Sequence, residues 1–159
     1  MPALEYPPFF AILRRFYDLD VNYVVIGGVA AILHGVLRAT FDLDVVIDFD
    51  EKNVAKIIKV LEEFNLKPTV PIDPAELSDA IKRKEWQEKK NARVINFIDP
   101  EGIYRLDVAL IYNYGEIKPL KITIDGVSVY VVGKEKLIQM KKAAGRDIDL
   151  RDIQYLQEL

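Results

Sequence analysis

The sequence contains no cysteine and only one histidine, His34. The lack of cysteine excludes disulfide bonds, zinc–thiolate sites and cysteine nucleophiles, and a single histidine excludes multi-histidine metal sites. No apolar run approaches the roughly 18 residues needed to cross a bilayer. Residues 1–8 carry an acid and three prolines, where a secretory signal needs basic residues and an apolar run. We therefore expect a cytoplasmic protein without a membrane partner.

An excess of charge of one sign is also missing. The chain has 22 basic and 25 acidic residues, so its net charge of -3 creates no overall attraction to nucleic acid or membrane. Half of its 159 residues are hydrophobic and 30% are charged, as in soluble globular proteins. This length and composition predict one domain over residues 1–159.

Hydrophobic periodicity predicts a mixed α/β (α+β) fold, with a sheet of about six strands backed by helices. The expected helices span residues 9–18, 29–35, 51–64, 74–90, 133–144 and 148–159. The expected strands span residues 21–26, 41–49, 92–98, 103–111, 120–124 and 127–132. We expect a loop over 67–74, and we expect the helix over 74–90 to turn Leu77, Ile81 and Trp86 inward.

Two aspartates, Asp42 and Asp44, begin the strand that continues as Val45-Val46-Ile47. Side chains alternate between faces along a strand, so both carboxylates project from the same face. Two like charges ~4 Å apart repel by roughly 1 kcal/mol in water and about 4 at an effective dielectric of 20. The pair is tolerated if a cation lies between the carboxylates or if one of them stays protonated. A metal site is the simpler explanation.

A third acid, Asp107, interrupts the apolar strand Tyr104-Arg-Leu-Asp-Val-Ala-Leu110. Alternation places Asp107 on one face with Arg105 and Ala109. A carboxylate on a central strand is costly without a partner, and the candidate partner is a cation shared with the aspartate pair. Carboxylate and phosphate oxygens are the ligands that Mg²⁺ prefers, and Mn²⁺ accepts the same set.

The glycine pair Gly27-Gly28 lies between a strand and an expected helix start. Free backbone N–H groups and the helix dipole favour phosphate at such a position. Residues 29–41 can form one short helix and return the chain beside the first strand. Arg38 and Thr40 stand just before the acids, and an arginine there can clamp a phosphate.

These residues together resemble the polymerase-β-like nucleotidyltransferase superfamily. Gly27-Gly28, thirteen residues, Asp42-Leu-Asp44 and a later strand aspartate match its signature. The segments His34-Gly35, Arg38-x-Thr-x-Asp-Leu-Asp and Glu135-Lys-Leu-Ile-x-Met-Lys-x-Ala-Ala-x-Arg-x-x-Asp-Leu-x-Asp152 are most similar to small stand-alone members related to AbiEii-type abortive-infection toxins. The resemblance spans roughly residues 20–155.

The resemblance implies a reaction and a set of roles. The glycine pair would hold an NTP, and Asp42, Asp44 and Asp107 would bind two Mg²⁺ while a hydroxyl attacks the α-phosphate. Lys141 would be a further phosphate contact. The acceptor is unknown and can be a protein, an RNA or a small molecule. Many active members have Gly-Ser in place of Gly27-Gly28, and members that elongate nucleic acid usually add a helical domain, so acceptor binding would need a partner or a second subunit.

Alternative interpretations remain open. The protein can be a toxin–antitoxin component that acts with or on a cognate protein, or a degenerate nucleotide-binding protein without turnover. Lys141, Arg146 and Asp149 can form exposed helix pairs of little energetic value. Arg38 can simply neutralise the strand acids, and we expect a structural role for His34.

Overall fold

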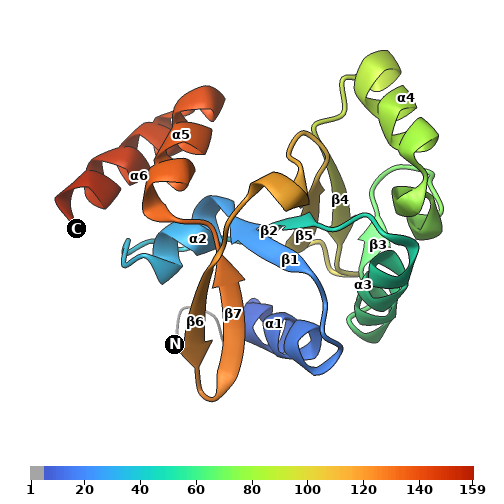
Figure 1. Ribbon diagram of the computed structural model, residues 1–159, viewed down its shortest axis with the longest axis horizontal. Coiled ribbons are helices and arrows are strands. Elements are labelled where there is room, and N and C mark those ends of the chain that lie inside the picture. The colour runs from blue at the N-terminus through green and yellow to red at the C-terminus, as the bar shows by residue number, and fades with distance from the viewer. Residues whose placement is uncertain (1–5) are drawn as a thin grey trace.

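The computed structural model describes residues 6–159 and is built around one seven-stranded sheet (Figure 1). The strands are β1 (Tyr23–Ile26), β2 (Asp42–Ile47), β3 (Lys67–Pro68), β4 (Val94–Ile98), β5 (Arg105–Ala109), β6 (Leu120–Ile124) and β7 (Val127–Val131). Their order across the sheet is β3-β4-β5-β2-β1-β7-β6. β2 lies parallel to β5 and antiparallel to β1. The two strands that carry the aspartates are therefore neighbours at the centre of the sheet.

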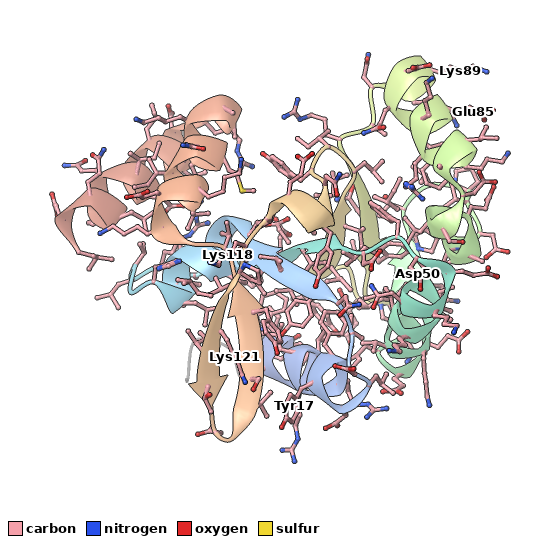
Figure 2. The ribbon with its side chains drawn as sticks, viewed as in Figure 1. Tyr17, Asp50, Glu85, Lys89, Lys118 and Lys121 are labelled. Atoms are coloured by element: carbon pink, nitrogen blue, oxygen red, sulfur yellow. The ribbon has the colours of Figure 1, made fainter. Side chains whose placement is uncertain are left out.

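Within residues 6–159, six α-helices and two short 3₁₀ helices surround the sheet. They are α1 (Phe9–Asp18), α2 (Gly27–Leu33), α3 (Glu51–Glu63), η2 (Pro74–Ser78), α4 (Ala80–Lys90), η3 (Tyr114–Glu116), α5 (Lys134–Ala144) and α6 (Asp147–Glu158). α1 packs against α3, whereas α5 and α6 lie beside α2 at one end of the molecule and α4 lies at the other end (Figure 1). Figure 2 shows Glu85 and Lys89 pointing outward from α4.

The central strands divide their side chains between two faces. Leu43 and Val45 of β2 and Leu106 and Val108 of β5 are fully buried in the hydrophobic core. Alternate residues of the same strands, including the three aspartates, project from the opposite face. Burial of the apolar face holds the register of these strands, since a slip of one residue would exchange the two faces.

The structure confirms the mixed α/β sheet and adds one strand to the six that were predicted. The extra strand, β3, pairs with β4 where a loop was expected over 67–74. Its two residues are too few to give a periodic signal in the sequence. Among the predicted strands, β4 pairs antiparallel with β5, and β6 pairs antiparallel with β7.

The helix predicted over 74–90 is divided into η2 and α4. Asp79 separates them, because its side chain accepts hydrogen bonds from the backbone N–H groups of Ile81 and Lys82 and so caps α4. The cap changes the helix phase, and Ile81 is 72% exposed, so the expectation that it points inward is wrong. Leu77 and Trp86 are buried as expected.

The sequence argument against a leader rests partly on residues 1–5, which lie outside the described residues. Within residues 6–159, no helix has the length and apolar character required to cross a bilayer.

Candidate active site

The sheet register brings the three aspartates together. Asp44 of β2 is aligned with Asp107 of β5 on one side and with Ile26 of β1 on the other. Asp42 is aligned with Arg105, and Asn96 of β4 is aligned with Asp107. Residues opposite each other in a sheet share a face. The three carboxylates therefore line the same face, as the strand alternation predicts.

Gly27 lies directly against Asp44. Its φ is +68°, and a Cβ placed on it would be 2.2 Å from Oδ2 of Asp44. Both the left-handed backbone and the lack of space require glycine here. α2 begins at Gly27, and its N-cap residue Ile26 offers no side-chain acceptor to the first N–H groups of the helix. The start of α2 is therefore beside the acid, with backbone donors that no side chain caps.

Gly28 allows a second close approach. A Cβ on Gly28 would be 3.1 Å from Oγ1 of Thr40 and 3.3 Å from Cζ of Arg38. The glycine pair thus brings two parts of the chain to the helix start: the aspartate strand against Gly27, and the segment before that strand against Gly28.

The acids perturb one another electrostatically. Burial, together with the charges of Asp107 and Asp42, raises the pKa of Asp44 to about 8. Burial also raises the pKa of Asp107, while a hydrogen bond from Nδ2 of Asn96 at 2.7 Å opposes that rise. Near neutral pH, the cluster without a bound cation thus keeps a proton at Asp44. The sequence left two alternatives for the close carboxylates, a shared cation or a protonated acid, and this is the second.

Arg105 provides the counter-ion for the other two acids. Its Nη2 lies 3.1 Å from Oδ2 of Asp42 and 3.4 Å from Oδ2 of Asp107. The sequence placed Arg105 on the acidic face but gave it no role, although its spacing of two residues from Asp107 was a usable signal. Asn96 was missed because its contact with Asp107 depends on the register of β4 against β5, which the sequence around Asn96 does not specify.

The acidic face forms the floor of a cleft of about 550 Å³, within the range of small-molecule sites. Seven of the eight predicted site residues line it: Gly28, Arg38, Thr40, Asp42, Asp44, Asp107 and Lys141. The eighth, Gly27, lines a smaller adjoining recess together with Asp44 and Lys141. Cleft residues that the sequence did not point to include Arg93, Asn96, Arg105 and Tyr112. The structure therefore brings all the predicted residues to one place.

Lys141 reaches the cleft from α5 within a buried ionic network. Its Nζ lies 2.7 Å from Oδ2 of Asp152 and 3.8 Å from Oδ1 of Asp149, and all three residues are at most 4% exposed. The interpretation of Lys141 and Asp149 as exposed helix pairs is therefore wrong. These residues are buried because α5 packs along α6, a tertiary contact that periodicity does not reveal. Arg146 pairs with Asp149 but keeps a 72% exposed side chain.

Arg38 joins the same network. Its Nη1 donates to Oδ2 of Asp152, so the guanidinium is paired with α6 rather than with the strand acids that it was expected to neutralise. His34 has a structural contact, with its Nε2 2.7 Å from the carbonyl oxygen of Val132 just before α5.

The carboxylate oxygens of the cleft are suitable ligands for a hard divalent cation such as Mg²⁺ or Mn²⁺. Three carboxylates converge without any sulfur or imidazole, and Asp44 makes no salt bridge within residues 6–159. In the arrangement present, however, no group of three acidic or histidine side chains among these residues is placed to hold a metal ion. The guanidinium of Arg105 lies between two of the three acids, so the carboxylates must rearrange around any ion.

Comparison with known proteins identifies the family. The family model described as a nucleotidyltransferase of unknown function (DUF6036) matches residues 12–157, so the chain belongs to this family. The predicted membership of the nucleotidyltransferase superfamily is confirmed, and the protein is a transferase of phosphorus-containing groups. The narrower likeness to AbiEii-type toxins stays a prediction. No curated protein matches the sequence.

Solved structures show the same fold at low sequence identity. The lincosamide antibiotic adenylyltransferase LnuA, solved with lincomycin, is 17% identical with a TM-score of 0.65, and the match covers 96% of each chain. The antibiotic-resistance factor ANT(2'')-Ia is 13% identical with a TM-score of 0.64 over 98% of this chain and 84% of that one. A nucleotidyltransferase-like protein from Paracoccidioides brasiliensis is 17% identical with a TM-score of 0.58, covering 92% of this chain and 72% of that one.

Proposed function

We propose that this protein transfers a nucleoside monophosphate from an NTP to an acceptor hydroxyl, with Mg²⁺ or Mn²⁺ held by Asp42, Asp44 and Asp107. The observation that carries the proposal is the sheet register that aligns Asp44 with Asp107 while Gly27 lies against the Asp44 carboxylate. An anionic phosphate chain at the start of α2 would therefore lie beside the acids that hold its cation.

The nucleotide would bind on the side of the cleft formed by α2 and α5. Backbone N–H groups of Gly27 and Gly28 would hold the β- and γ-phosphates. Arg38, Thr40 and Lys141 line the same cleft. Thr40 would offer a hydroxyl, and Arg38 and Lys141 would contact the phosphates by sharing or leaving their ion pairs with Asp152. A cleft lined by both cations and acids matches a ligand composed of a phosphate chain and its metal.

The chemistry requires one proton transfer and one displacement. The acceptor oxygen bonds to the α-phosphorus while the bond from that phosphorus to the bridging oxygen breaks, and pyrophosphate leaves with the bond electrons. Asp107, aligned next to Asp44, would take the proton of the acceptor hydroxyl. When bound, a divalent cation supplies activation of that hydroxyl and neutralisation of the charge on the transferred phosphate.

Small molecules are the first acceptors to test. LnuA was solved with lincomycin, and ANT(2'')-Ia was solved with adenylyl-2''-tobramycin. A cleft of about 550 Å³ could hold a nucleotide and part of a small acceptor. RNA or a cognate protein partner, as in a toxin–antitoxin pair, would have to approach from the open side of the cleft.

Two measurements test the proposal. Calorimetric titration with each NTP should show binding that requires Mg²⁺ or Mn²⁺. Asp44→Asn should abolish this binding, whereas the control Asp125→Asn in the β6–β7 turn should bind NTP normally.

The second measurement is incubation with α-labelled NTP and candidate acceptors, which should transfer label to an acceptor. Binding without transfer to any acceptor would favour the degenerate interpretation, and transfer that occurs only with a partner protein would favour a toxin–antitoxin role. Equal, metal-independent binding by all three proteins would refute the metal site.

A further inference from the structure

The guanidinium of Arg105 lies between two of the three acids, Asp42 and Asp107. One nitrogen, Nη2, faces two carboxylates, at 3.1 Å from Asp42 and 3.4 Å from Asp107. The Arg105 and Asp42 side chains are each 40% exposed, and that of Asp107 is 6% exposed. The arginine therefore reaches the acids from the open side of the cleft, and it can leave toward solvent without disturbing the core.

The pairing of Arg105 is incomplete compared with that of a neighbouring arginine. Its Nε is the one buried side-chain polar atom without a hydrogen-bond partner within residues 6–159. By contrast, Arg146 holds Asp149 with two nitrogens, at 2.7 Å from Nε and 3.2 Å from Nη2. An arginine fork binds a carboxylate best with two parallel donors, and a buried donor without an acceptor is costly. The contacts of Arg105 thus balance the acidic charge without the geometry of a permanent ion pair.

We infer that Arg105 is a built-in counter-ion that takes the place of the divalent cation between Asp42 and Asp107 and must leave before a metal can bind. The inference rests on the proposed function, since it concerns the same metal site. It explains why the described residues hold no ready group of three metal ligands: two of the three carboxylates are turned toward the guanidinium. It also explains how neighbouring acids are stable without a metal.

The test is the affinity of the purified protein for Mn²⁺ alone, measured by calorimetric titration. Arg105→Gln should lower the Kd for Mn²⁺ by about tenfold, because two partly exposed ion pairs need no longer be broken. Arg93→Gln is the matched control: Arg93 lines the same cleft, is exposed, and makes no salt bridge within residues 6–159. It removes the same charge without removing a contact to the acids, and we expect a change below about threefold from the lost charge alone.

Three outcomes overturn the inference, and they are distinguishable. Unchanged or weaker Mn²⁺ binding in Arg105→Gln overturns it if Asp44→Asn still abolishes binding, and the proposed function then survives. An equal gain in Arg93→Gln also overturns it, because the gain is then a general effect of charge. A lack of Mn²⁺ binding in every protein overturns the proposed function and this inference together.

A second measurement applies even if Arg105→Gln does not fold. In the wild-type protein, the Nε–H resonance of Arg105, assigned by its loss in Arg105→Lys, should shift when Mg²⁺ is added. The resonance of Arg146, which stays on Asp149, should shift much less. An Arg105 signal that stays in place at saturating Mg²⁺ would show that the guanidinium does not move.

Discussion

Replacement of Asp44 by asparagine should stabilise the protein without metal, and increasingly so as the pH rises. The Asp44 side chain is partly buried, has no cation of its own within residues 6–159, and has its pKa raised to about 8 by burial and by two neighbouring acids. Asparagine has nearly the same shape and never ionises. Its amide can donate to Asp107 as a protonated carboxyl group does.

The direction of this stability change follows from the protonation of Asp44 in the unfolded and the folded protein. In the unfolded chain Asp44 ionises near its ordinary pKa of 3.8, whereas in the folded protein it keeps its proton up to about pH 8. Between these values the unfolded state has bound fewer protons, so the wild-type protein loses stability as the pH rises, and the loss is complete above the folded pKa. The variant has no such loss.

The expected size of the effect is a few kcal/mol. A pKa difference between 3.8 and about 8 corresponds to about 6 kcal/mol at most, at 1.36 kcal/mol per pKa unit. Because the side chain is partly exposed and water screens part of the repulsion, we expect about 2 kcal/mol near pH 8 and almost none near pH 4.

Urea unfolding in the presence of a chelator measures this difference. The free energies of unfolding of wild type and Asp44→Asn are compared at about pH 5 and about pH 8. Asp125→Asn serves as the control, because it removes one carboxylate at an exposed turn residue with φ +48°, where asparagine is equally suitable. The electrostatic account of the cluster would be refuted if the difference in free energy of unfolding between wild type and Asp44→Asn did not change with pH, or if it became smaller as the pH rises.

Three further predictions concern other parts of the site and fold. Gly27→Ala should reduce NTP binding in calorimetry and lower the free energy of unfolding by about 2 kcal/mol, because its Cβ would meet Asp44. Binding and stability equal to those of the wild type would refute the close approach of Gly27 to Asp44. Asp152→Asn should lower the free energy of unfolding, measured in urea, by about 3 kcal/mol, since it leaves Lys141 buried with a weaker partner. An unchanged free energy of unfolding would contradict the buried ionic network of Lys141. Ile81→Ser should change stability by less than about 0.5 kcal/mol, and a large loss would mean that Ile81 is buried after all.

Much of the acidic site was predictable because its signals are local. Asp42 and Asp44 share a face through strand alternation alone, and the burial of the residues between and after them sets that alternation. Gly27 and Gly28 stand at a strand-to-helix bend whose residue types already indicate the backbone conformation. The helix and strand boundaries around these motifs agree with the predictions to within a few residues.

The missed ion pairs depend on contacts between distant segments. Arg105 reaches Asp42 only because β5 lies parallel to β2, and Arg38 reaches Asp152 only because α6 packs near the segment before β2. Contacts between distant segments are set by packing, and periodicity in one segment contains no information about them. The exposure of Ile81 has a local cause instead, because the cap at Asp79 restarts the helix in a different phase.

The residue pattern alone thus determined which side chains have the chemistry for phosphate and metal, because alternation along a strand and glycine at a bend are properties of a few adjacent residues. Tertiary structure decided how those charges are balanced: a proton stays on Asp44, Arg105 lies between the other two acids, and two aspartates of α6 hold Lys141 and Arg38. The reason is physical, since the energy of a charge depends on its burial and on its neighbours in space, and both arise only when the sheet and the last two helices are assembled.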